Sequence, residues 1–262
     1  MSEAAPAPSS TVAPADLQIW AVRGIGEVRP GDDLVACVGD ALARGPGVRD
    51  GDIVVVTQKI VSKAEGRLCD LATVEPSAFA RAWAAAYGKD PRHVEVVLRE
   101  ARRIVRMERG VLIAETRHGF VCANAGVDAS NVPGDDVVCL LPVDPDASAE
   151  RLRAGLAARF DARLGVVISD TFGRPWRNGQ TNIAIGVAGV RALLGYQGQR
   201  DPYGRELRVT EIAVADELAA AAELVMAKTI GVPVALLRGV AALLGTGTAQ
   251  DLVRAPEHDF FR

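Results

Sequence analysis

The sequence predicts an α/β protein in which mixed sheets carry flanking helices, and three observations lead to this fold class. First, Ile53–Thr57 (IVVVT) and residues 164–168 (LGVVI) are short apolar runs rich in β-branched side chains, which is typical of buried strands. Second, Leu34–Arg44 and the alanine-rich residues 216–228 have the composition and spacing of helices. Third, 262 residues, 49% of them hydrophobic, suffice for one large domain or two small ones with a sizeable core.

Charge and cysteine usage exclude several classes of protein. A net charge of −3 disfavours a general nucleic-acid or membrane surface, so we expect neither partner. Four scattered cysteines and three histidines give neither zinc-site spacing nor a disulfide framework, which indicates a reducing, cytoplasmic setting. No apolar run is long enough to span a bilayer, and the N-terminus lacks the pattern of a secretory signal.

The first half of the chain alternates strands and helices. Residues 1–16 are rich in Ala, Pro and Ser and predict a disordered tail, followed by a folded unit over 17–262, expected to form two intertwined subdomains. Asp90 and Pro91 form a typical helix start. In order we expect a strand at 17–23, a glycine-rich turn at 24–27, a helix at 34–44, a strand at 53–57, helices at 77–87 and 91–103, and a hairpin made by 111–115 and 119–122.

A basic run that begins at the end of the helix expected at 91–103 is expected to form a solvated face, as charge runs usually do. Its residues are Arg102, Arg103, Arg106 and Arg109. His93 is expected on the helix surface, because no second histidine stands at metal-ligand spacing.

The second half continues the alternation. We expect Asp146 to cap a helix that runs from 147 to 160, because aspartate accepts hydrogen bonds from the first free N–H groups. The other expected elements are an apolar segment at 137–141, strands at 164–168, 209–213 and 232–237, a helix at 216–228, and a short helix at 248–253.

Three polar clusters follow strands or sit in loops of small residues. Residues 57–67 place Lys59 and Lys63 just after a buried strand, where lysine can bind phosphate. Residues 124–131 and 169–180 each contain a lone aspartate, Asp128 and Asp170, whose oxygens suit a hard cation. Each cluster also has an alternative explanation. Residues 57–67 could be a solvated amphipathic segment, 124–131 a turn in which Asp and Asn bond their own backbone, and 169–180 a solvated loop in which Asp170 caps a helix.

Combined, the clusters provide aspartates from separate loops together with lysine and arginine. This set of side chains can hold a nucleoside triphosphate with Mg²⁺ or Mn²⁺. The sequence contains no GxxxxGK[ST] motif and no GxGxxG motif that opens a helix. Composition and spacing therefore predict metal-dependent phosphoryl chemistry at a site that uses neither of these two nucleotide-binding motifs.

Longer motifs resemble the coenzyme F-420 γ-glutamyl ligase family, the CofE-like proteins, and the ligase half of the two-domain protein FbiB. The resemblance covers residues 22–239 and is carried by VVVTQKIVSKAEGR, CANAGVDASNVPG, LPVDPDASAERLR, VVISDTFGRPWRNGQTNIAIGVAG, RDPYGRELRVTEIAVADELAAAAELV and VPVALLRG. It implies a GTP-dependent ligase that adds L-glutamate to the lactyl carboxylate of a deazaflavin precursor, coenzyme F-420-0, and extends the tail through γ-linkages. It also implies the family's mixed α/β fold, a homodimer, a divalent metal (Mn²⁺ or Mg²⁺) and K⁺.

The resemblance assigns roles to individual residues. Asp128 in NAGVDASN matches a metal aspartate, and Asp170 with Thr171 matches a metal-binding pair. Together with Lys63, the two aspartates are the expected catalytic residues. The expected nucleotide contacts are Ile25, Gly26, Glu27, Val28, Lys63 and Asn131, with Gln58 and Lys59 at positions where some members carry small hydroxyl residues. The loop 227–231 lacks the carboxylate that some members have there.

The mechanism that this implies is acyl activation. The precursor's carboxylate attacks the γ-phosphorus of GTP, and the amine of glutamate then displaces phosphate. On charge grounds, Arg174 and Arg177 are candidates for binding the anionic precursor or glutamate. Two other functions stay open: a different nucleotide-dependent acid–amine ligase, and a non-catalytic nucleotide-binding subunit.

Overall fold

The computed structural model describes residues 16–260 and has a mixed α/β fold, as predicted. The tail expected at 1–16 lies, except for Asp16, outside the described residues. The main sheet has the strand order β1-β12-β2-β8-β9. Its strands are β1 (Gln18–Val22), β12 (Val234–Arg238), β2 (Ile53–Thr57), β8 (Gly165–Arg174) and β9 (Arg177–Ala188).

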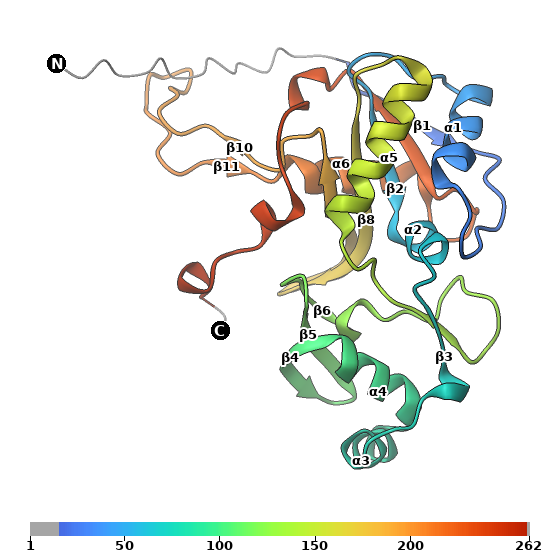
Figure 1. Cartoon of the computed structure of the whole chain (residues 1–262). Coiled ribbons are helices and arrows are strands. Elements are labelled where there is room, and N and C mark those ends of the chain that lie inside the picture. Colours follow the sequence, from blue (N-terminus) through green and yellow to red (C-terminus); the bar gives the residue numbers. More distant parts are fainter. Residues whose placement is uncertain (1–15, 261–262) are drawn as a thin grey trace.

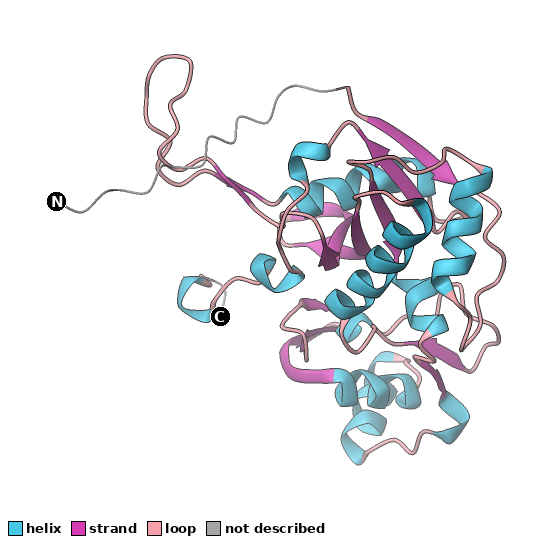
Figure 2. Cartoon of the chain, turned by 45° about the horizontal axis from the view of Figure 1, so that its top comes forward, coloured by secondary structure: helices cyan, strands magenta, loops and turns pink. Residues whose placement is uncertain are grey.

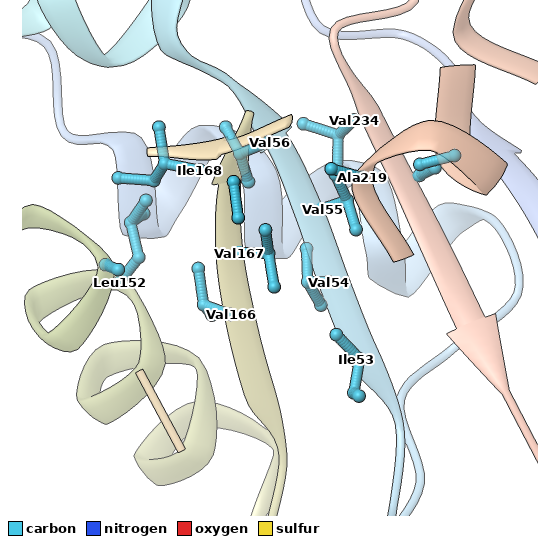
Figure 3. Close-up of a cluster of buried hydrophobic side chains, with 14 of the residues drawn as sticks. Ile53, Val54, Val55, Val56, Leu152, Val166, Val167, Ile168, Ala219 and Val234 are labelled. Atoms are coloured by element: carbon cyan, nitrogen blue, oxygen red, sulfur yellow. The ribbon is translucent and has the colours of Figure 1, made fainter. Parts of the chain in front are cut away.

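Strands β2 and β8 form the parallel pair at the centre of this sheet, and the other pairs are antiparallel. Residues 53–56 and 165–169 are buried, because helices cover both faces of the sheet. The apolar runs that predicted these strands therefore form the centre of the main core (Figure 3).

Four helices pack around the sheet: α1 (Leu34–Arg44), α2 (Gln58–Ala64), α5 (Pro145–Phe160) and α6 (Val214–Met226). Helices α1 and α5 contact each other on one face, and α6 lies on the other (Figure 1). In Figure 3, Leu152 of α5 lies beside Val166 and Ile168, and Ala219 of α6 approaches from the other side.

A second cluster of buried side chains belongs to elements that lie below the main sheet in Figure 1. It packs helices α3 (Ala78–Tyr87) and α4 (Pro91–Glu100) against the sheet β4 (Ala101–Glu108), β5 (Val111–Thr116) and β6 (Val121–Ala123). Strands β3 (Leu68–Asp70) and β7 (Val137–Cys139) pair nearby. The division into two intertwined subdomains stays a prediction.

An arm extends from the body between β10 (Leu194–Gly195) and β11 (Glu211–Ile212), as Figure 2 shows. The strand expected at 209–213 is thus only two residues long. Short 3₁₀ turns occupy Leu71–Thr73, Asn124–Gly126, Ala241–Leu243, Ala249–Leu252 and Pro256–His258, the fourth of them where a last helix was expected. In the part of the chain that the structure describes, no helix is long and apolar enough to cross a membrane.

The loop expected after residue 168 is instead a long β-hairpin. Strand β8 continues to Arg174, and β9 returns from Arg177. The ladder slips between Ile168 and Ser169, where Ile185 of β9 is the extra residue of a β-bulge. Asp216 of α6 accepts a hydrogen bond from the neighbouring Ala184 N–H at 2.9 Å.

The helix expected at 91–103 ends at Glu100, and the following basic run lies on β4. Pairing with β5 satisfies the backbone there, which overrides the helical spacing. All four arginines are exposed, as expected, and two of them, Arg102 and Arg103, also pair with the buried Glu115. His93 is partly buried rather than a surface residue, and this burial lowers the pKa of its imidazole.

Helix α5 begins earlier than expected. Asp144, not Asp146, is its N-cap and accepts from Ala147 N. The Asp146 carboxylate accepts instead from Val187 N at 2.8 Å and from Ala249 N at 2.9 Å, and so joins the helix start to β9 and the C-terminal segment.

An ion pair closes the opposite end of β2. Asp52 is fully buried and accepts two hydrogen bonds from the Arg238 guanidinium, at 2.8 and 2.6 Å, and one from Arg49 N. Arg238 also lies 5.0 Å from the centre of the Trp20 ring. The pair therefore ties β1 and β12 to the start of β2.

Replacing Asp52 should be strongly destabilising. Asp52→Ala leaves the Arg238 guanidinium without its partner, and we expect it to lower the free energy of unfolding by about 3–5 kcal/mol. Urea denaturation measures this loss. Asp40→Ala, which breaks the exposed pair with Arg159, is the control and should change little. A loss below about 1 kcal/mol for Asp52→Ala would contradict the assigned role.

Candidate functional site

A cavity of about 1030 Å³ lies between the main sheet and the second cluster. Its walls come from five segments: residues 25–28, the end of β2 with α2, residues 122–133, the hairpin β8–β9, and residues 223–233. The three predicted polar clusters thus share one cavity. The walls include four carboxylates and three lysines among the described residues: Glu27, Asp128, Asp170, Glu223, Lys59, Lys63 and Lys228.

The parallel pair β2–β8 brings two of these clusters together. Thr57 pairs with Ser169, so both strands reach the cavity at the same level. Helix α2 starts directly after Thr57 and carries Lys59 and Lys63, while β8 continues to Asp170. Functional groups collect at the carboxyl ends of parallel strands for this geometric reason.

Asp128 forms an ion pair in the cavity wall. Its Oδ2 lies 2.6 Å from Lys59 Nζ, and Ser130 donates to it from both its backbone N–H and its hydroxyl. Burial on its own would raise the pKa of Asp128, but the hydrogen bonds from Lys59 and Ser130 outweigh it and keep the pKa below its ordinary value. Asp128 is therefore an anion near neutral pH.

Asp170 has a different environment. Its side chain is partly open to the cavity and otherwise surrounded by protein, and burial raises its pKa to about 6. The Thr171 N–H, at 2.8 Å from Oδ1, and the charges of Lys59 and Lys228 act in the opposite direction. Burial and the nearby Asp170 carboxylate also raise the pKa of the Cys122 thiol to about 12. Asp170 thus carries a charge that a bound cation would stabilise.

Lys63 holds the segment 25–28 against α2. Its ammonium is almost fully buried and lies 2.5 Å from Glu27 Oε1. Gln58, also buried, accepts a hydrogen bond from Ser62 at 2.7 Å and supports the same helix.

Sequence reasoning missed a polar network next to Asp170. Thr171 Oγ1 donates to Asn182 Oδ1 at 2.6 Å, and Asn182 Nδ2 donates to Glu223 Oε2 at 2.9 Å. Lys228 Nζ donates to Thr171 Oγ1 and lies 4.0 Å from Glu223 Oε1. The only signal for Glu223 was its place in a helix whose face could not be assigned from the sequence.

The structure brings most of the predicted residues together. Ile25, Gly26, Glu27, Val28, Gln58, Lys59, Lys63, Asp128, Asn131, Asp170 and Thr171 all line the cavity. Arg174 and Arg177 are exposed near the tip of the hairpin and are not among the lining residues, and Arg174 donates to the Asn178 carbonyl at 3.1 Å. Residues 227–231 contribute Lys228 but no carboxylate, as the sequence indicates.

The donor atoms around Asp170 fit a hard divalent cation. They are all oxygens: the carboxylates of Asp128 and Asp170, the Thr171 hydroxyl, and the Ser169 hydroxyl, which is buried without a hydrogen-bond partner. Within residues 16–260, no three His, Cys, Asp or Glu side chains converge on one point. Such a site suits Mg²⁺ or Mn²⁺, which use one or two carboxylates and complete their shell with water and phosphate oxygens.

Several known proteins have sequences similar to this chain over most of its length. The chain is 46% identical over 241 residues to the coenzyme F420:L-glutamate ligase of Methanopyrus kandleri, covering 90% of this chain and 94% of that protein. The protein of the same name from Methanothermobacter thermautotrophicus is 45% identical over 250 residues, covering 94% and 99%. That of Methanocaldococcus jannaschii is 45% identical over 216 residues, covering 82% and 86%.

A family model described as F420-0:Gamma-glutamyl ligase matches residues 24–239, a span that contains every cavity-lining residue. Because this match and the similarity to these ligases extend over most of the chain, the protein belongs to the F420-0:γ-glutamyl ligase family.

Proposed function

We propose that this protein is a GTP-dependent ligase that joins L-glutamate to the lactyl carboxylate of coenzyme F420-0 and then extends a γ-linked tail. Members of its family are ligases that form a C–N bond. The observation that carries the finer proposal is the single cavity that holds Asp128 and Asp170 together with three lysines. A volume of about 1030 Å³ leaves room for a nucleotide beside a second substrate.

The proposed reaction has two steps. The lactyl carboxylate attacks the γ-phosphorus of GTP, which yields an acyl phosphate and GDP. The amine of glutamate then attacks the acyl carbon and displaces phosphate. Most of the catalysis in such phosphoryl transfer comes from positioning and charge stabilisation, which fixed lysines and carboxylates provide.

Each wall of the cavity has a role in this proposal. Asp128, Asp170 and Thr171 would hold the divalent cation, which supplies charge neutralisation at the β- and γ-phosphates when bound. Lys59 and Lys63 would bind phosphate oxygens in place of Asp128 and Glu27. The segment 25–28 and Asn131 would contact the rest of the nucleotide. A requirement for K⁺ is part of the proposal and rests on the family resemblance.

The activity is tested directly by mass spectrometry of coenzyme F420-0 after incubation with protein, GTP, Mn²⁺ and L-glutamate. We expect GDP and glutamylated product to form together, and only when both GTP and glutamate are present. Equal product without any nucleotide would contradict acyl-phosphate activation.

Asp170→Asn should separate function from stability. It keeps the shape of the side chain but removes the charge, and we expect turnover to fall by about 100-fold or more. In metal-free protein the unfolded carboxyl titrates near 3.8 and the folded one near 6, so the folded state loses stability as pH rises through that interval. Asp170→Asn removes this loss, and its free energy of unfolding at pH 7.5 should exceed that of the wild type by up to about 3 kcal/mol.

Urea denaturation at pH 5 and pH 7.5, with chelator present, measures the difference, which should shrink at the lower pH. Asp135→Asn is the matched control, because Asp135 is exposed and outside the cavity lining. Near-normal turnover of Asp170→Asn at saturating Mn²⁺ would remove Asp170 from the mechanism.

We further propose that the protein is a homodimer. Apolar side chains stand exposed on α6 and on the arm, with Leu224 at 82%, Tyr203 at 91% and Val209 at 92% exposure. Burying such residues against a second copy would stabilise the assembly.

Light scattering should therefore give about twice the 27.6 kDa mass of one chain at working concentration. Dilution should lower activity if the second copy completes the site. A mass of one chain with full activity would contradict the dimer.

A further inference from the structure

Glu223 differs from Glu27 and Asp128, two other carboxylates of the cavity, in having no described lysine within hydrogen-bond distance. In the described part of the chain, Glu27 is paired with Lys63 at 2.5 Å and Asp128 with Lys59 at 2.6 Å. Asp170 accepts from Thr171 N. Glu223 uses Oε2 to accept from Asn182, and its Oε1 lies 4.0 Å from the Lys228 ammonium, which is too far for a hydrogen bond.

Lys228 gives this end of the cavity an opposite charge close to that oxygen. Its side chain is more than half exposed and reaches Thr171 Oγ1. An anion and a cation about 4 Å apart, both facing a cavity, match the two ends of a free amino acid, which carries an ammonium and carboxylates.

The position of this pair relative to Asp170 is also fixed. Asn182 links Glu223 to Thr171, the residue after Asp170, through hydrogen bonds of 2.9 and 2.6 Å. A ligand on Glu223 therefore lies beside the place where Asp128 and Asp170 would hold the phosphate-bound cation. The lysines at 59 and 63 stand on α2, a different wall of the cavity.

We propose that Glu223 binds the ammonium group of the incoming L-glutamate and that Lys228 binds one of its carboxylates. This inference rests on the proposed ligase function and assigns the amino-acid subsite within the same cavity. On charge grounds the sequence favoured Arg174 and Arg177 for this role, but they are not among the lining residues, whereas Glu223 and Lys228 are.

In the ligation step, the glutamate nitrogen forms a bond with the acyl carbon, and the bond from that carbon to the phosphate oxygen breaks. The nitrogen loses two protons between ammonium and amide. One leaves with the phosphate as HPO₄²⁻, and the other passes to water. Glu223 remains ionised and holds the nitrogen in position before attack.

The test uses Glu223→Gln in the full chain with GTP, Mn²⁺ and coenzyme F420-0. The amide keeps an oxygen for Asn182 but removes the charge that attracts ammonium. We expect KM for L-glutamate to rise about 10- to 100-fold, the loss that follows from removing one charge-assisted hydrogen bond. KM for GTP and the Kd for Mn²⁺ should stay within twofold.

Hydroxylamine separates the two halves of the reaction, because it is uncharged and traps an acyl phosphate as a hydroxamate. Without glutamate, hydroxamate formation by Glu223→Gln should stay within about threefold of the wild type. Glu217→Gln, on the exposed side of the same helix and outside the cavity lining, is the matched control and should leave every constant unchanged.

Two results would overturn the assignment of Glu223. One is an unchanged KM for L-glutamate. The other is a parallel loss of hydroxamate formation or Mn²⁺ affinity, which would place Glu223 at the cation. A wild-type protein that forms no hydroxamate with GTP would instead overturn the acyl-phosphate proposal, and this inference with it.

Discussion

Strands β2 and β8 run parallel through the centre of the sheet, with Thr57 opposite Ser169, and this pairing fixes the geometry of the cavity. Both strands are buried, so a register shift would move apolar side chains into the cavity and polar ones into the core. The pairing therefore places the lysines of α2 and the carboxylate of Asp170 in the wall of one cavity. The Asp52–Arg238 pair secures the same strand at its other end.

The cavity wall contains ion pairs whose charged groups could bind a ligand instead. Asp128 and Glu27 hold the Lys59 and Lys63 side chains in place, so neither ammonium has to move far when phosphate replaces its partner. In the proposed function, phosphate binding at Lys59 would release Asp128 towards the cation beside Asp170. Phosphate at Lys59 would leave Asp128 without its lysine, and a cation at Asp128 would leave Lys59 without its carboxylate. Nucleotide and metal would thus each favour binding of the other.

The sequence predicted the central strands and most of the cavity lining, because those residues follow apolar runs whose direction and end are clear. Asp170 and Lys63 belong to this group, whereas Asp128 was predicted from its place in a loop of small residues. Glu223 and Asn182 were not predicted, since one lies on a helix with apolar residues around much of its circumference and the other on a strand that resembled a loop. The hairpin was missed because its tip is polar and exposed, as at Arg177, while the backbone there pairs with β8.

The β-bulge at Ile185 has a mechanical consequence. On the hairpin side of the bulge, two residues of β9 bond to helix α6. Ala184 N donates to the Asp216 carboxylate, and Asn182 donates to Glu223. These two hydrogen bonds connect this part of β9 to helix α6. Because Ala219, Ala222 and Met226 bury α6 in the main core, these two bonds oppose bending of the hairpin at the bulge. Thr171, Asn182 and Glu223 should therefore keep fixed positions relative to one another in the cavity wall.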